Sequence, residues 1–179
     1  MLDPAIGVLL IGCLALLFAS AALHKLRNLA HFAEVLRAYR ALPEGLVRLA
    51  PLVPLAELTV AVGLLPAATR SGAALAGVAL LLSYAAAIGV NLGRGRRDLA
   101  CGCGGPDDAR PIAAWMVVRN LVLALLLAVT LLPWQTRALL PTDLVTIGAG
   151  AVVATLLYIS LDRLLGRVLP WTRALGGPG

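Results

Sequence analysis

Long stretches without charged residues restrict the fold of this chain more than any other feature. A helix needs about 20 mostly apolar residues to cross a bilayer core of about 30 Å. Five stretches approach or reach that length, and three of them hold one charged residue each: residues 4–23, 49–69 with Glu57, 70–91 with Arg70, 111–136 with Arg119, and 144–161. Leu- and Ala-rich stretches without strict alternation favour helices over membrane strands. The sequence therefore predicts an all-α, polytopic bundle of five transmembrane helices.

Composition supports this interpretation. The chain of 179 residues is 60% hydrophobic and 13% charged, whereas soluble domains average about 45–50% and about 25%. The first stretch is not expected to be a cleaved signal peptide, although Ala19-Ser20-Ala21 resembles a cleavage site. The residues before it include Asp3 and no Lys or Arg, the reverse of a signal sequence.

The distribution of Lys and Arg predicts the orientation in the membrane. Twelve of the fifteen lie in the loops after the first and third stretches or in the C-terminal tail, and two, Arg70 and Arg137, lie in the other loops. By the positive-inside rule, the N-terminus lies outside, and the loop after residue 91 and the C-terminus are cytoplasmic. Anionic lipid headgroups account for the net charge of +6, so no nucleic-acid partner is expected.

The segment after the first stretch has helical periodicity. Apolar residues between 28 and 42 recur at helical spacing, with Glu34, Arg37 and Arg40 on the polar side. This pattern predicts an amphipathic helix at the cytoplasmic interface. The loop at 93–110 is rich in Gly, Arg and Asp, which predicts irregular backbone.

The clearest chemical signal is Cys101-Gly-Cys103-Gly-Gly in that arginine-rich loop. A disulfide between Cys101 and Cys103 would close a small, strained and easily reduced ring, which suits electron transfer better than structural bracing. The neighbouring arginines would favour the thiolate. Ordinary reduced thiols are the alternative, because structural disulfides are rare in the cytosol.

A metal site is the third interpretation of these cysteines. It would need His24, and then His31 or Asp107, to complete four ligands. Nothing in the spacing enforces that set, so we assign no metal. The third cysteine, Cys13, lies mid-stretch and is interpreted as a small buried hydrophobe.

Charged and amide side chains inside the predicted spans form a second candidate site. Glu57 and Arg119 each lie about eight residues from the cytoplasmic start of a span, so a direct ion pair would satisfy both. The other polar residues expected at this depth are His24, Lys25, Asn91 and Asn120. Such a pocket could relay protons or hold the headgroup of a quinone cofactor. It could equally be a structural pair that fixes helix register.

Several motifs together resemble the methylamine-utilisation protein MauE family, within the DoxX-like membrane proteins. They are His24-Lys25-Leu26, Pro54-Leu-Ala-Glu57-Leu58, Asn91-Leu92-Gly93-Arg94-Gly95, Cys101-Gly-Cys103-Gly-Gly, Trp115 and Arg119-Asn120. This family usually has an aromatic residue after the second cysteine, where this chain has Gly104. The resemblance implies a four-helix core with redox-associated thiols. We therefore divide the chain into a MauE/DoxX-like domain at 1–140, and a fifth transmembrane helix with a basic tail at 141–179.

The resemblance and the dithiol together predict an inner-membrane protein of thiol–disulfide exchange. Cys101 and Cys103 would exchange electrons with a thioredoxin-like protein and support maturation of exported, disulfide-containing clients resembling methylamine dehydrogenase. One alternative is a non-enzymatic scaffold that recruits a thioredoxin-like protein. A small transporter is a weaker alternative, because no inverted repeat is visible.

Overall fold

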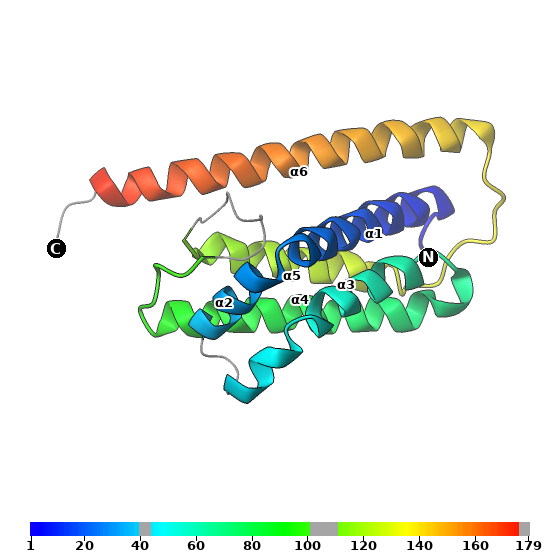
Figure 1. Cartoon of the computed structure of the whole chain (residues 1–179). Coiled ribbons are helices and arrows are strands. Elements are labelled where there is room, and N and C mark those ends of the chain that lie inside the picture. Colours follow the sequence, from blue (N-terminus) through cyan, green and yellow to red (C-terminus); the bar gives the residue numbers. More distant parts are fainter. Residues whose placement is uncertain (40–43, 101–110, 176–179) are drawn as a thin grey trace.

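The computed structural model describes residues 1–39, 44–100 and 111–175, and these residues form a helical bundle (Figure 1). Its elements are α1 (Pro4–Arg27), α2 (Leu29–Tyr39), the 3-10 helix η1 (Glu44–Leu49), α3 (Leu52–Gly63), α4 (Ala67–Gly93), α5 (Ala114–Val129) and α6 (Pro141–Leu175). Within the described part of the chain there is no sheet, only two isolated bridges. The predicted all-α membrane bundle is confirmed, and α2 forms where amphipathic spacing predicted a helix.

Three helices are long and apolar enough to cross a membrane: α1, α4 and the Pro141–Asp162 part of α6. The other two predicted spans form shorter helices than expected. α3 has 12 residues and α5 has 16, which correspond to about 18 and 24 Å of helix.

The sequence predicted a boundary between two spans at Arg70. In the structure the boundary lies earlier, because α3 ends at Gly63 and α4 begins at Ala67. Pro66 has an extended backbone (ψ 139°) and directly precedes α4. A proline disfavours continuation of a helix that approaches it, and α3 accordingly ends before Pro66, at Gly63. Arg70 then donates to the carbonyls of Leu64 and Leu65. The charged side chain therefore satisfies the end of α3 from within the first turn of α4.

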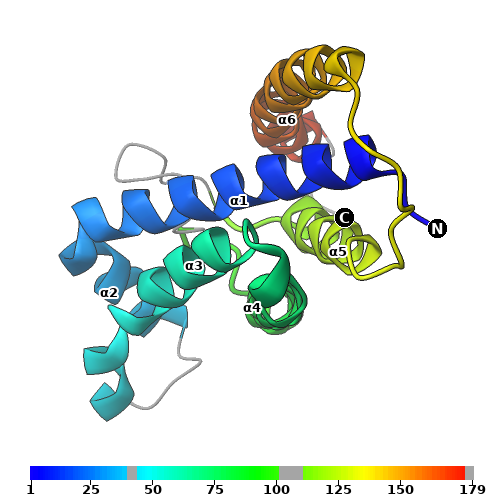
Figure 2. The same cartoon turned by 90° about the vertical axis from the view of Figure 1, so that its right-hand side faces the viewer.

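The core lies between α1, α3, α4 and α5. α1 packs against α3, α4 packs against both α3 and α5, and α6 lies along the outer side of α1 (Figures 1 and 2). Small residues permit close approach on α4. A Cβ atom at Gly77 would lie 2.5 Å from a methyl of Leu127, 3.0 Å from Val60 and 3.3 Å from Phe18. The outward residues of α6 are exposed and apolar, as expected for a helix in contact with lipid.

The two ends of the bundle differ. At one end lie the C-termini of α1 and α4 and the N-termini of α3 and α5, together with Lys25, Arg27, Arg94, Arg96 and Arg97; we call this the cation-rich end. At the opposite end, Leu2 pairs with Trp134, and Arg137 joins the first turns of α1 and α6.

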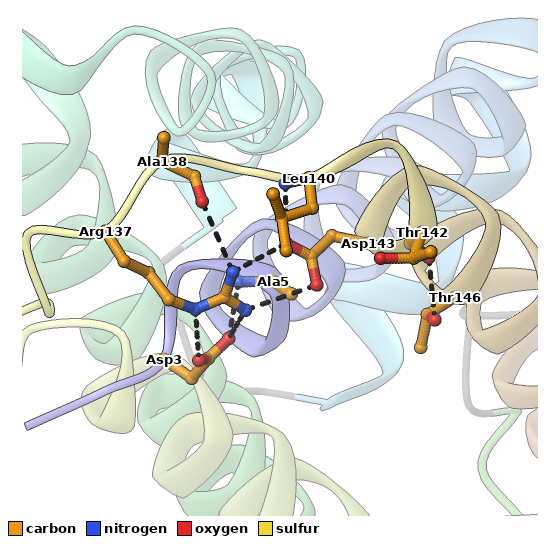
Figure 3. A network of polar contacts seen from close by, with 8 residues as sticks. All are labelled: Asp3, Ala5, Arg137, Ala138, Leu140, Thr142, Asp143 and Thr146. Atoms are coloured by element: carbon orange, nitrogen blue, oxygen red, sulfur yellow. Dashed lines mark hydrogen bonds and ion pairs between the residues drawn. The ribbon is translucent and has the colours of Figure 1, made fainter.

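Arg137 makes the polar network shown in Figure 3. Its guanidinium donates to both carboxylate oxygens of Asp3 at 2.8 and 2.9 Å, and to Asp143 at 2.6 Å. Asp3 also caps α1 by accepting from the backbone N–H of Ala5. Hydrogen bonding from Arg137 lowers the pKa of the Asp3 carboxyl. The hydrogen bonds that Arg137 donates to Asp143 and Asp3 raise the pKa of its guanidinium.

Candidate functional site: a buried ion pair at the cation-rich end

Lys25 and Glu57 form an ion pair in the interior of the cation-rich end. The ammonium of Lys25, in the last turn of α1, donates to Glu57 Oε1 of α3 at 2.6 Å. The two side chains are 7% and 1% exposed, so the pair is shielded from solvent. Tyr84 of α4 donates its hydroxyl to the same Oε1 at 2.8 Å. One carboxylate oxygen therefore joins three helices.

Aromatic rings surround the ammonium. Lys25 Nζ lies 5.7 Å from the ring centroid of Phe32 on α2 and 5.5 Å from that of Tyr84. Both distances are within the range of about 6 Å for cation–π attraction. The rings and the carboxylate together compensate for the water that the ammonium loses on burial.

The second oxygen of Glu57 has no hydrogen-bond partner among the described residues. Oε2 is buried, and no donor reaches it. A buried acceptor left unsatisfied costs about 1–3 kcal/mol, and more when the group is charged. In native proteins such an atom calls for a specific explanation, such as a bound water molecule or ligand.

The predicted ion pair between Glu57 and Arg119 is wrong. Arg119 of α5 instead binds Asp162 of α6 at 2.8 Å, and its guanidinium carbon lies 5.2 Å from the ring centroid of Trp115. Glu57 and Arg119 lie on α3 and α5, and both of these helices pack against α1 and α4. Equal depth in the membrane did not determine which way each side chain faces.

Asn91 belongs to a different contact of the cation-rich end. It is 1% exposed, donates to Ala87 of its own helix and accepts from Arg96 at 3.0 Å. Arg96 also donates to the carbonyls of Ala38 and Tyr39 at the end of α2, at 2.6 and 3.4 Å. This guanidinium holds the C-terminus of α2 against the C-terminus of α4.

A left-handed turn directs Arg96 toward α2. Gly95 has φ +74°, and the N–H groups of Gly95 and Arg96 donate to the carbonyls of Leu92 and Asn91. This is the Schellman pattern, in which glycine is favoured because positive φ strains other residues. Asn91 thus receives both the backbone and the side chain of Arg96.

The remaining predicted site residues are not brought to the ion pair. Asn120 is buried and donates to Met116 of its own helix, and His24 is exposed. Cys101 and Cys103, and Asp107 of the metal alternative, lie outside the described residues. In the described part of the chain, no three His, Cys, Asp or Glu residues are grouped as a metal site would require. Cys13 is a half-buried free thiol.

The described residues on either side of the Cys101–Cys103 segment lie next to each other. Ile112 N–H donates to the carbonyl of Leu99 at 2.9 Å, and Ala100 pairs with Pro111. Ile112 is fully buried in a second apolar cluster with Val35, Tyr39, Ile88 and Met116. The two described ends of this segment therefore meet at one point of the cation-rich end, beside α2.

Comparison with known proteins identifies the family. The family described as "Methylamine utilisation protein MauE" matches residues 3–133. The chain belongs to the MauE family. It is similar to the methylamine utilization protein MauE of Paracoccus denitrificans, with 44% identity over 86% of this chain and 83% of the relative. The MauE of Methylophilus methylotrophus is 35% identical over 92% and 88%, respectively. No solved structure matches the chain.

The matched region of this MauE family member runs from the start of α1 to the residue before Trp134, and α6 lies beyond it. Three contacts of the site were not predicted. Tyr84 lies within the apolar stretch at 70–91, and Phe32 lies on the apolar side of α2, so neither residue was singled out. Asp162 directly follows the apolar stretch at 144–161, and this acidic residue was the available signal for a partner of Arg119.

Proposed function

We propose that this MauE family protein is a membrane component of thiol–disulfide exchange in methylamine utilisation, with Cys101 and Cys103 as the exchanging thiols. The observation that supports this most is the placement of the described residues that flank the dithiol segment. Its flanking residues, Leu99 and Ile112, are hydrogen-bonded to each other at the cation-rich end. A partner that docks at this end of the protein would therefore meet the point at which the Cys101–Cys103 segment begins and ends.

The chemistry is a two-electron exchange. A thiolate of a reduced partner attacks one sulfur of the Cys101–Cys103 disulfide and forms a mixed disulfide, and the second partner thiolate then releases it. The partner becomes a disulfide while Cys101 and Cys103 become thiols, so two electrons and two protons change carriers. The reverse reaction oxidises the partner. The exposed Arg94 and Arg97 favour the thiolate form at this end.

The partner class follows from this chemistry. A thioredoxin-like protein supplies a vicinal dithiol, and its own substrate would be an exported, disulfide-containing protein. The relatives are named for methylamine utilisation, which makes a client in that process our proposal. We also propose that the protein lies in the plasma membrane with the cation-rich end facing the cytoplasm, because basic residues concentrate there.

Cysteine variants test the redox role. Cys101→Ser/Cys103→Ser should abolish growth on methylamine in a host that requires the protein, with its membrane level unchanged. One of the two single variants, Cys101→Ser or Cys103→Ser, should accumulate a mixed disulfide between its remaining cysteine and an oxidised thioredoxin-like protein, visible on non-reducing gels, and this variant identifies the attacking thiol. Cys13→Ser is the matched control and should behave as wild type, since Cys13 lies within α1. Full growth of the double variant would disprove thiol exchange and favour the scaffold role.

Labelling with a membrane-impermeant maleimide tests the orientation. In a Cys13→Ser background, reduced Cys101 and Cys103 should be labelled only after cell lysis. Labelling in intact cells would place the cation-rich end outside. Comparison of samples with and without reductant would also report whether the pair is a disulfide in the cell.

A further inference from the structure

The Lys25–Glu57 pair has unused hydrogen-bonding capacity on both partners. Glu57 accepts two hydrogen bonds at Oε1, whereas Oε2 accepts none from the described residues. The Lys25 ammonium has three N–H donors, and its one hydrogen bond within the described chain is to Glu57. A free acceptor and free donors thus lie side by side in an interior site.

Two aromatic rings border the buried ammonium. Phe32 and Tyr84 lie at 5.7 and 5.5 Å from Lys25 Nζ, near the outer limit of about 6 Å for this contact. Phe32 is carried by α2, a separate 11-residue helix. A modest displacement of this one ring would give a small group access to the pair.

The charges select a neutral guest. Lys25 and Glu57 carry one positive and one negative charge, so the pair is balanced, and an added ion would leave a net charge in an interior site. The guest must donate to Glu57 Oε2 and accept from Lys25 Nζ. A hydroxyl group is the smallest group that does both.

We propose that the Lys25–Glu57 pair binds one neutral hydroxyl group, carried by a membrane-soluble quinol or by a single water molecule. A quinol would place one hydroxyl between Glu57 Oε2 and Lys25 Nζ and its ring against Phe32 and Tyr84. Glu57 is the sixth residue of α3, about 8 Å along that helix, a depth that a lipid-soluble ring can reach. The proposal concerns binding alone and does not depend on the thiols.

Binding of a short-chain ubiquinol to the full chain in lipid nanodiscs tests the quinol source. With partitioning into empty nanodiscs subtracted, the wild type should show saturable binding. The oxidised quinone lacks the hydroxyl that donates to Oε2, so it should bind about tenfold or more weakly. Glu34→Gln, which changes an exposed carboxylate on α2, should leave both affinities unchanged.

A double variant removes the site while preserving the fold. Glu57→Gln alone leaves Lys25 buried without its counter-ion, so this variant is expected to lose stability and is not the variant of choice. Lys25→Met/Glu57→Met replaces both charges with apolar side chains, a change that is often neutral for stability. Saturable quinol binding should disappear in this variant. Binding of equal strength in the double variant would overturn the quinol source.

Solid-state NMR of the wild type tests the water source without a variant. Magnetisation transfer from water to the side-chain carboxyl carbon of Glu57 should be rapid if a water molecule occupies the site. Rapid transfer without quinol binding assigns the hydroxyl to water. Neither quinol binding nor water transfer would overturn the proposal.

Discussion

Lys25 of α1 and Glu57 of α3 meet at 2.6 Å inside a bundle whose interior is otherwise mainly apolar. The contact joins the end of one long helix to the first turns of a short one. α3 has 12 residues, too few to cross a bilayer core of about 30 Å without additional residues. The ion pair therefore fixes the position of a helix that the membrane alone would not place.

Removal of one partner of this pair should be costly. Glu57→Ala leaves the Lys25 ammonium buried without its carboxylate, and loss of one partner from a buried pair typically costs about 3–5 kcal/mol. We expect a large drop in the thermal midpoint in detergent. Lys25→Met/Glu57→Met should recover most of it, and Glu34→Ala, at an exposed position, should change little. Equal destabilisation by the single and double variants would contradict this account.

Arg137 should make the stability of the opposite end depend on pH. Hydrogen bonding from Arg137 lowers the pKa of Asp3 in the folded protein, so the stability contributed by Asp3 is fully present above the unfolded value of about 3.9. It is lost as pH falls through the lowered folded value. We expect the thermal midpoint of the wild type to fall with pH in this acidic range.

Arg137→Gln is the variant that tests this pH dependence. It should already be less stable at neutral pH and should lose less on acidification, because Asp3 no longer has its ionic partner. Arg94→Gln removes an exposed arginine at the cation-rich end and is the control, with the wild-type pH profile. Parallel profiles for Arg137→Gln and wild type would refute the assignment.

The helical bundle could be predicted from the sequence, because the length and hydrophobicity of the apolar stretches are enough to identify membrane helices. The stretches at 4–23 and 70–91 were identified by comparing their lengths with the thickness of a bilayer, and the structure has α1 and α4 there. The boundary near Pro66 was missed because the charge of Arg70 was taken as the helix limit. Arg70 instead folds back onto the preceding carbonyls, where proline has already ended α3.

The pairing of charges was beyond sequence reasoning because it depends on helix rotation. Glu57 and Arg119 have similar depths, but neighbouring helices set which way each faces. Lys25 was expected among the polar residues at this end, and in the structure it contacts Glu57, since the end of α1 and the start of α3 lie at the same end of the bundle. Tyr84 was not expected, because a tyrosine within an apolar stretch carries no charge signal.

Gly77 should be the least replaceable glycine of α4. A Cβ atom there would contact side chains from α1, α3 and α5, the nearest at 2.5 Å. Gly77→Ala should therefore destabilise the bundle by about 1–3 kcal/mol. Gly89→Ala, on the same helix with no atom within 4 Å of the new Cβ, should be neutral or slightly stabilising. Unfolding in mixed detergent micelles measures both, and equal effects would exclude close packing at Gly77.

Arg96 should hold α2 against the bundle through hydrogen bonds and not through charge. Its guanidinium donates to Ala38, Tyr39 and Asn91, and a lysine ammonium cannot reproduce this planar fork. Arg96→Lys keeps the charge but should raise amide hydrogen exchange in the last turn of α2 several-fold, since each lost bond is worth about 1 kcal/mol. Arg97→Lys changes an exposed neighbour and should leave exchange at the wild-type rate. Hydrogen-exchange mass spectrometry of α2 peptides measures both, and an unchanged rate in Arg96→Lys would show that apolar contacts of Val35 and Tyr39 alone hold the helix.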